Sequence, residues 1–377
     1  MDGVATLFRL WGIPVRVHAS WLVIFGLLAW SLSVGYFPHV LPDLPLVAHW
    51  ANGFLAALLL FVSVLLHELS HSVAALRYGI PVSGITLHIF GGVSQLEREP
   101  DRPGVEVVVA VVGPLTSFAI AAVLTLALRL LDPPAAAAAI MRYLVIVNAV
   151  VGVFNLVPGF PLDGGRLLRA ALWKLKGNQH WATRMASRAG SGFAFLLMGL
   201  GILRALAGEF LGGLWFVVIG LFLHQAAAGS YQQLLLRRAL GPLAVRDVMT
   251  REVIHVPPDL TVARVVEEFF WPHHVSSFPV LDGGRVVGIL SLHQLRQVPR
   301  ERWETTRVRE LMLPLTDSLT AGPGDPLWQA FEKLSGNGLG RLTVVERGRL
   351  AGYLSIKDVA HIIAVTSGLG GPQGGRP

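Results

Sequence analysis

The sequence has no cysteine among its 377 residues. Disulfide bonds are therefore excluded, and cysteine usage leaves the redox compartment open. Thiolate ligands are excluded as well, so a tightly bound zinc ion would have to use histidine, aspartate or glutamate side chains.

Charged residues are also scarce. They make up 15% of the chain, against about 25% in a typical soluble domain. Long apolar runs dominate the sequence up to about Tyr231, whereas the part from Arg237 onward has the composition of an ordinary soluble protein. This contrast predicts a membrane domain over 1–236, a linker at 237–243 and a soluble domain after it.

Six stretches have about the 20 mainly apolar residues that a transmembrane helix needs. They lie at about 18–37, 51–76, 105–128, 138–157, 190–207 and 211–230. The first follows Arg9 and Arg16, as a signal sequence would, but it is as long as a full span and lacks a small-residue cleavage site. We therefore expect an uncleaved anchor and a polytopic α-helical membrane domain.

Lysine and arginine near the ends of the spans predict their orientation. One set of connections carries only Arg129, Arg142 and Arg204. The other set carries Arg9, Arg16, Arg77, Arg98, Arg102, Arg166, Arg169, Lys174, Lys176, Arg184, Arg188, Arg237 and Arg238. With an even number of spans, both termini of this multi-pass cell-membrane protein are predicted to be cytoplasmic. The same placement explains the net charge of +7 without nucleic acid as a partner.

The second predicted span contains the motif His67-Glu68-Leu69-Ser70-His71. Its two histidines are separated by one helical turn, so both rings project from one face and can bind one metal ion. Glu68 stands beside them, where it could take a proton from water. Because a charged group at the centre of a span costs about 2.5–3.5 kcal/mol, a metal site explains these residues better than polar contacts between helices do.

A catalytic zinc site usually has three protein ligands and one open position. The candidate for the third ligand is Asp163, which closes the fourth span. Pro158 and Pro161 interrupt regular helix there, and at membrane depth such backbone is tolerated only inside protein or beside water. The alternative is that Asp163 caps a helix over 164–176; the histidine pair favours the ligand interpretation.

These two motifs, about 90 residues apart, resemble those of the site-2 protease family of intramembrane zinc metalloproteases. The second motif reads Asn155…Pro158…Pro161-Leu162-Asp163-Gly164, and the runs Gly12–His18 and Phe90–Val93 also match. The resemblance implies a metalloendopeptidase in which His67, His71 and Asp163 hold one zinc ion and Glu68 is the general base. It also implies that Asn155 holds the substrate or its oxyanion. The sequence departs from the family at Ser117, where an asparagine is usual, and has no PDZ-like insertion.

The resemblance further implies a substrate with a transmembrane segment in the lipid bilayer, such as a membrane-tethered anti-sigma or pro-sigma factor. A helical substrate must unwind before its peptide bonds can be cut. The segment Val82–Leu96 predicts two short strands that turn at Gly91-Gly92. We hypothesise that their edge pairs with the unwound substrate as an added strand; the alternative is a plain cytoplasmic loop.

The soluble part repeats itself. Residues 245–249 recur in similar form at 308–312, and residues 287–291 recur at 351–355. Each unit predicts a strand, a helix, a two-stranded hairpin and a helix, with turns at 282–284 and 347–348. The pattern resembles a tandem pair of CBS repeats, an α/β module, at 244–300 and 306–364. The Gly- and Pro-rich tail at 365–377 is predicted to be disordered.

CBS pairs often bind adenosyl nucleotides. Ser355-Ile356-Lys357-Asp358 matches the family's Ser/Thr-x-x-Asp motif, whose carboxylate can accept ribose hydroxyls, whereas the first repeat has Gln294 in place of the aspartate. The resemblance thus implies at most one good ribose site, at Ser355 and Asp358, for an adenine nucleotide. A purely structural pair, or one that forms a homodimer, is the alternative.

Three functions are compatible with these sequence features. They are an intramembrane protease modulated by the repeats, a membrane transporter or channel gated by them with a structural metal site, and a zinc-binding fold without proteolysis. A pore needs polar residues through the whole depth of the bilayer, and Glu68 is intact. Both observations favour the protease.

Overall fold

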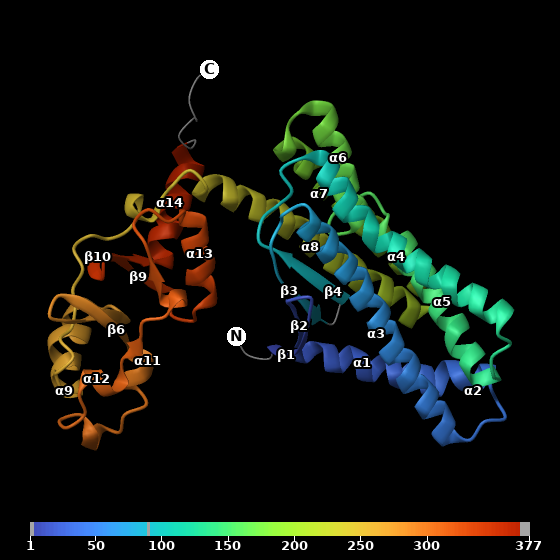
Figure 1. Ribbon diagram of the computed structural model, residues 1–377, viewed down its shortest axis with the longest axis horizontal. Coiled ribbons are helices and arrows are strands. Elements are labelled where there is room, and N and C mark those ends of the chain that lie inside the picture. The colour runs from blue at the N-terminus through green and yellow to red at the C-terminus, as the bar shows by residue number, and fades with distance from the viewer. Residues whose placement is uncertain (1–3, 89–90, 370–377) are drawn as a thin grey trace. The chain divides into compact units, whose positions relative to one another are not determined.

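The computed structural model describes residues 4–88 and 91–369. The chain divides into two compact units, which meet in the sequence between Gln232 and Gln233. The first is mainly helical and the second is an α/β unit (Figure 1).

The first unit has six helical segments that are long and apolar enough to cross a membrane. They are α1–α2 (Ala19–Val40, joined through a π-helical turn at Leu32–Tyr36), α3 (Leu46–Arg77), α4 (Pro103–Leu130), α5 (Ala135–Asn155), α7 (Gln179–Leu206) and α8 (Phe210–Leu240). The predicted polytopic class is confirmed. Helix α7 begins well before its apolar run because the side chain of Asn178 caps it, accepting from the backbone N–H of Trp181.

Small residues let these helices approach closely. A Cβ atom at Gly53 of α3 would collide with the hydroxyl of Ser33, and Ala56 and Ala57 beyond it are fully buried. Ser33 donates its hydroxyl hydrogen to the carbonyl oxygen of Ala29 at 2.7 Å, so its polar group is satisfied within its own segment. Because lipid tails are as apolar as leucine, this close packing, rather than hydrophobic burial, holds membrane helices together.

A four-stranded sheet completes the first unit, in the order β1-β2-β3-β4. Its strands are β1 (Val4–Leu10), β2 (Ile13–His18), β3 (Val82–His88) and β4 (Gly91–Leu96). The predicted strands β3 and β4 are confirmed. The predicted turn at Gly91-Gly92 is wrong, because both glycines belong to β4, and residues 89 and 90 lie outside the described part of the chain.

Strands β1 and β2 were not expected from the sequence. Strand β2 pairs in parallel with β3, with Val15 opposite Ile85. Ile13, Val15 and Val17 are buried, while the residues between them are partly exposed. This alternation is typical of a half-buried strand and was the signal available for finding it.

Between α5 and α7 the chain leaves regular helix over 156–162 and then forms the short helix α6 (Asp163–Lys176). A Cβ atom at Gly164 would collide with the carbonyl oxygens of Leu156 and Val157. The backbone N–H of Phe160 donates to the carbonyl oxygen of Ala186 in α7 at 3.2 Å. Direct backbone packing therefore fixes the start of α6, where Asp163 stands.

The second unit contains a six-stranded sheet in the order β5-β6-β10-β9-β8, with β7 paired to β6. Its strands are β5 (Ser277–Asp282), β6 (Arg285–Ser291), β7 (Leu313–Pro314), β8 (Thr320–Ala321), β9 (Arg341–Glu346) and β10 (Arg349–Ser355). The hairpins β5-β6 and β9-β10 turn at Gly283-Gly284 and Arg347-Gly348. All four turn residues have positive φ, as a type I′ turn requires. Both predicted hairpins and their turns are confirmed.

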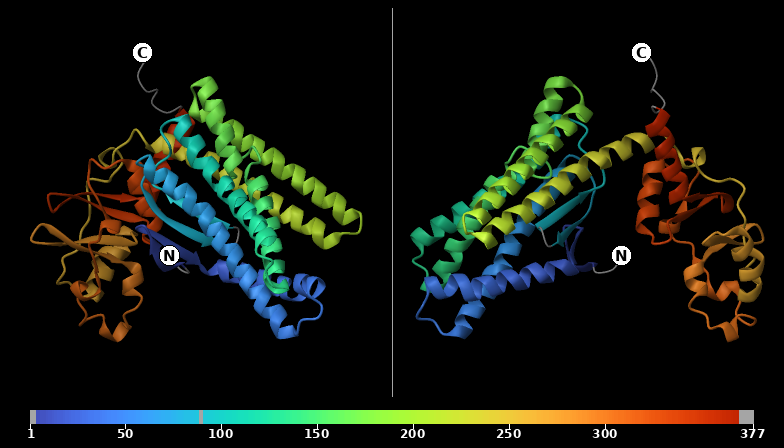
Figure 2. Two further views of the ribbon diagram at one scale, coloured as in Figure 1. Left: turned by 45° about the vertical axis from the view of Figure 1, so that its right-hand side comes forward. Right: turned by 180° about the vertical axis from the view of Figure 1, so that it is seen from behind.

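Each repeat has its own helices (Figure 2) and its own apolar core. The helices are α9 (Val262–Val265), α10 (Trp271–His273), α11 (Leu292–Leu295), α12 (Val308–Leu311), α13 (Leu327–Gly336) and α14 (Ile356–Leu369). Phe278 and Leu290 lie in the core of the first repeat. Leu327, Leu342 and Leu354 lie in that of the second.

The segments predicted as linker and tail are partly helical. Helix α8 continues to Leu240, whose side chain is fully buried in the core of the second repeat, and the guanidinium of Arg237 lies 5.0 Å from the ring centroid of Trp328. Helix α14 continues to Leu369, so residues 365–369 are helical rather than irregular. The rest of the predicted tail, 370–377, lies outside the described residues.

Candidate functional site

Three side chains of the first unit converge at one point. The Nε2 atoms of His67 and His71 in α3 each lie 3.2 Å from Oδ2 of Asp163 in α6. All three side chains are buried or nearly so. Within the described ranges 4–88 and 91–369, they form the one group of at least three histidine or acidic side chains whose ligand atoms lie within 4.8 Å of one another.

The geometry of this cluster fits zinc. Ligand atoms at about 2.0–2.1 Å from a tetrahedral zinc ion lie roughly 3.3 Å apart, close to the 3.2 Å between Oδ2 of Asp163 and each imidazole nitrogen. Two imidazoles and one carboxylate form a donor set that zinc enzymes use. Asp163 does not act as the cap of α6, because Leu162 holds the N-cap position and makes no side-chain cap hydrogen bond.

The other ring nitrogens of both histidines contact helix α4. Nδ1 of His71 lies 2.6 Å from the carbonyl oxygen of Val109, and Nδ1 of His67 lies 3.0 Å from the hydroxyl of Ser117. A carbonyl only accepts, so Nδ1 of His71 carries the hydrogen and Nε2 keeps its lone pair for a metal. Ser117 can hold His67 in the same tautomer, a role that sequence reasoning missed.

Gly113 of α4 lies between these two contacts. A Cβ atom there would stand 2.6 Å from Nε2 of His67 and would also collide with the ring of His71. Glycine is therefore needed because α4 passes directly against the two imidazoles.

Glu68 contacts the sheet. Its Oε2 accepts the backbone N–H of Ser94 in β4 at 3.1 Å, and a Cβ atom at Gly92 would collide with the Glu68 side chain. Strand β4 stands at one end of the strand order of its sheet. The edge that it does not share with β3 thus faces Glu68 at Ser94.

Asn155 stands in the last turn of α5, half-buried, and its amide donates to the carbonyl oxygen of Val151 at 3.1 Å. This contact stays within its own helix, so the role expected for Asn155 remains a prediction. A second asparagine that the sequence did not single out, Asn148, is buried and donates to the carbonyl oxygen of Leu144 and the hydroxyl of Ser63.

The residues predicted to bind nucleotide line a cavity of about 280 Å³ in the second unit, together with Thr250, Arg341 and Tyr353. Asp358 accepts the backbone N–H and the hydroxyl of Ser355 through Oδ2, at 2.8 and 2.7 Å. Tyr353 bonds the hydroxyl of Ser277 at 2.9 Å, and burial raises the pKa of its phenol. Tyr353 is therefore a neutral hydrogen-bonding group at pH 7.

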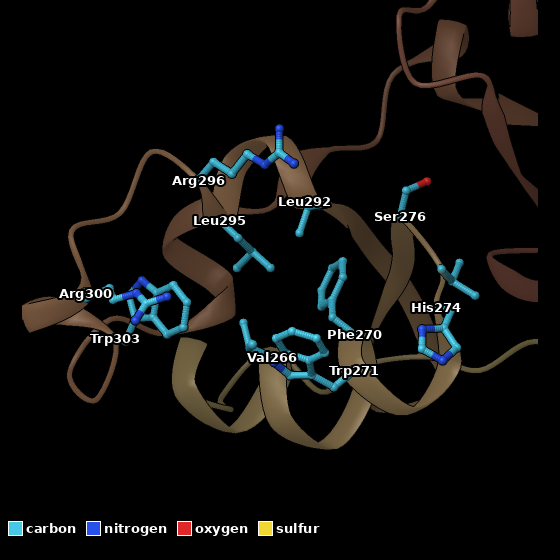
Figure 3. Close-up of a pocket in the computed structure, with 11 residues that line it drawn as sticks. Val266, Phe270, Trp271, His274, Ser276, Leu292, Leu295, Arg296, Arg300 and Trp303 are labelled. Carbon is cyan, nitrogen blue, oxygen red and sulfur yellow. The ribbon is translucent and has the colours of Figure 1, made fainter.

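A larger cavity of about 870 Å³ lies in the first repeat. Figure 3 shows Val266, Phe270 and Leu295 around it, with Arg300 beside Trp303; the guanidinium of Arg300 lies 5.6 Å from the ring centroid of Trp303. Ser355 and Asp358 are not among its lining residues, so it is distinct from the predicted nucleotide site.

Comparison with known proteins finds a matching family for each of the two units. Residues 55–134 and 132–199 match the model of peptidase family M50, and residues 245–301 and 308–365 match that of the CBS domain. The chain is 36% identical to the zinc metalloprotease Rip3 of Mycobacterium tuberculosis over 97% of this chain and 94% of that protein. A zinc metalloprotease of Synechocystis is 32% identical, with 95% of each chain covered.

A solved site-2 protease from Methanocaldococcus jannaschii is 30% identical and covers 60% of this chain and 95% of its own, with a TM-score of 0.43. The donor set, the family match and the relatives together define a membrane zinc metallopeptidase with a second unit of CBS type. The chain belongs to peptidase family M50, the site-2 protease family, and carries a tandem pair of CBS domains. The predicted enzyme class is confirmed, and the transporter or channel alternative is not favoured.

We predict that Ser117→Ala weakens metal binding, because it removes the group that holds the His67 ring. Loss of such a supporting contact typically lowers metal affinity by about 10- to 100-fold. The measurement is the zinc that remains on the detergent-purified protein after challenge with a chelator. The matched control is Thr116→Ala, which removes the neighbouring hydroxyl that bonds only Val112 of its own helix; equal zinc loss in both variants would contradict the role of Ser117.

Proposed function

We propose that the chain is an intramembrane protease that cuts transmembrane segments of other proteins at a zinc ion held by His67, His71 and Asp163. The observation that carries the proposal is the convergence of their three ligand atoms within a bundle of apolar helices. Glu68, next to His67 in the sequence, supplies the acid–base group that hydrolysis needs.

When bound, zinc supplies a Lewis acid that makes water nucleophilic near neutral pH. The Glu68 carboxylate takes a proton from the attacking water as its oxygen adds to the scissile carbonyl carbon, and passes that proton to the leaving nitrogen when the C–N bond breaks. The Asn155 amide turns from Val151 to donate to the substrate carbonyl, whose oxygen gains negative charge. His67 and His71 keep their orientation through Ser117 and Val109.

Strand β4 guides the unwound substrate to this point. The Ser94 N–H, which now bonds Glu68, is the kind of outward-facing donor that an added strand would pair with. A substrate strand on this edge would replace Glu68 as the partner of Ser94 and would lie directly beside the released carboxylate. Pairing of the substrate with β4 would therefore also release the Glu68 carboxylate to act as the base.

The substrate is a membrane-tethered regulatory protein, such as an anti-sigma factor, and both termini of the protease are cytoplasmic. The distribution of lysine and arginine between the two sides supports this orientation.

An adenine nucleotide in the cavity at Ser355 and Asp358 modulates proteolysis. Oδ2 of Asp358 is engaged by Ser355, and the same carboxylate lines the cavity, so its remaining oxygen can accept ribose hydroxyls. Helix α8 continues past the boundary of the first unit and ends at Leu240, whose side chain lies in the core of the second repeat. Modulation requires that the nucleotide binds two arrangements with different affinity.

We predict that Glu68→Gln lowers cleavage at least ~100-fold while one zinc ion per chain remains, because glutamine keeps the size of the side chain but cannot accept the proton. The double variant His67→Ala/Asp163→Ala should instead lose the metal. The assay co-expresses candidate single-span proteins with each variant, sequences the cut ends and measures zinc on the purified protease. Activity of Glu68→Gln above a tenth of wild type would exclude the role of general base.

We predict that Ser94→Pro blocks cleavage of a transmembrane substrate, because it removes the outward N–H of Ser94 without changing the side of β4 that pairs with β3. Proline is tolerated on the free side of an edge strand. The control Ser94→Ala keeps the N–H and loses only the hydroxyl contact with Ser72, so it should remain active. Wild-type cleavage by a folded Ser94→Pro variant would contradict strand addition.

We predict that ATP, ADP or AMP binds the purified full-length protein and that Asp358→Ala weakens this binding, because the ribose loses its acceptor. Titration calorimetry measures the affinity, and cleavage with and without nucleotide measures the modulation. Absence of heat at millimolar nucleotide would refute the ligand, whereas unchanged affinity in Asp358→Ala would refute only the residue. Lys357→Ala, at the neighbouring lining position, shows how specific the effect is.

A further inference from the structure

A buried ion pair joins helices α4 and α6 outside the predicted ligand set. Glu106 of α4 is completely buried, and Arg169 of α6 is nearly so. Nε of Arg169 donates to Oε1 of Glu106 at 2.5 Å, and its Nη1 donates to Glu99 at 3.1 Å. Gln179 also donates to Glu99 at 3.1 Å, and the Arg169 guanidinium lies 5.3 Å from the ring centroid of Phe160.

A contribution to folding stability alone does not explain this buried ion pair well. Removing two charges from water is costly, and apolar residues of similar volume often serve stability as well or better. Oε2 of Glu106 is buried and has no hydrogen-bond partner among the described residues, so the carboxylate is not fully satisfied. Buried ionic groups of this kind can specify how two elements align.

The place of Glu106 on α4 shows which groups this ion pair aligns. Glu106, Val109, Gly113 and Ser117 recur at helical spacing and so lie along one face. Val109 and Ser117 contact the two histidine rings, and Gly113 lets the helix pass against both. Glu106 extends the same face to α6 through Arg169.

Helix α6 transmits this contact to the third ligand. Asp163 precedes Arg169 by six residues, roughly 9 Å along the helix axis. A sliding or rotation of α6 on α4 would move Arg169 and Asp163 together, because a short helix moves as a rigid body. The pair thus sets the position of the Asp163 carboxylate relative to rings that are held by the same helix α4.

We propose that Glu106 and Arg169 are positioning residues that hold helix α6 in register with helix α4, so that Asp163 stays within ligand distance of His67 and His71. The proposal rests on the assignment of these three residues as zinc ligands. It adds a fourth position to the face of α4 that contacts the two histidine rings, and it assigns a role to two charged residues that the hydrolysis itself does not use.

The test compares Arg169→Met, Glu106→Gln and the double variant Glu106→Gln/Arg169→Met in full-length, detergent-purified protein. Lys174→Met, at an exposed position in the last turn of the same helix, is the control. Three quantities are measured: zinc retained after a chelator challenge, the visible spectrum of the cobalt-substituted protein, which reports ligand geometry, and the thermal unfolding midpoint. None of them depends on a substrate.

We predict that Arg169→Met loses zinc at least ~10-fold faster than wild type, the lower range for supporting residues of metal sites. Glu106→Gln should stay closer to wild type, because its amide oxygen still accepts from Arg169. The double variant leaves neither Glu106 nor Arg169 charged, so its unfolding midpoint should recover relative to Arg169→Met. Its zinc loss should stay fast and its cobalt spectrum altered, which separates positioning from folding.

Wild-type zinc retention and an unchanged cobalt spectrum in the double variant would overturn the proposal and leave the pair a folding role only. If Arg169→Met does not fold, the double variant gives the decision, because it leaves neither Glu106 nor Arg169 charged. Stoichiometric zinc in His67→Ala/Asp163→Ala would refute the ligand assignment itself. That outcome is distinguishable, because it does not depend on Glu106 or Arg169.

Discussion

The close passage of α4 against α3 at Gly113 is the contact on which the candidate site depends. Because residue 113 has no side chain, both imidazoles lie against the α4 backbone, and their Nδ1 atoms reach Ser117 and Val109. Those contacts direct the Nε2 atoms toward Asp163. A larger side chain at position 113 would push α4 away from α3 and break the contacts of both Nδ1 atoms. The distance between these two helices therefore determines both their packing and the geometry of metal binding.

Features that depend on local sequence could be predicted. The apolar spans, the histidine pair one turn apart and the two-residue turns at 283–284 and 347–348 follow from periodicity and backbone preference. Asp163 could be predicted as a ligand because a catalytic zinc site with two histidines usually needs a third protein ligand. The contacts of Ser117 and the pairing of Glu106 with Arg169 could not be predicted, since each joins helices distant in the sequence and depends on how they rotate against one another.

The two CBS repeats show that one short motif can either fix the start of a helix or, in addition, offer a contact to a ligand. Gln294 accepts the backbone N–H of Ser291 at 3.1 Å, as Asp358 accepts that of Ser355 in the second repeat. Both side chains therefore fix the start of a helix, and only Asp358 brings a charge to its cavity. From sequence, this contact within the helix and a contact with a ligand are indistinguishable, because both need an oxygen at the same position.

The parallel pairing of β2 with β3 has a consequence for biosynthesis. Val15 and Ile85 are neighbours, yet α1–α2 and α3 lie between them in the chain. During synthesis the β1-β2 hairpin leaves the ribosome before β3 and stays without this partner until the helical pair between them has been made and has returned the chain to the sheet. Because strand β4 joins the sheet only through β3, the edge beside Glu68 is completed only after both of these helical segments have been made, and a nascent chain lacks this edge until then.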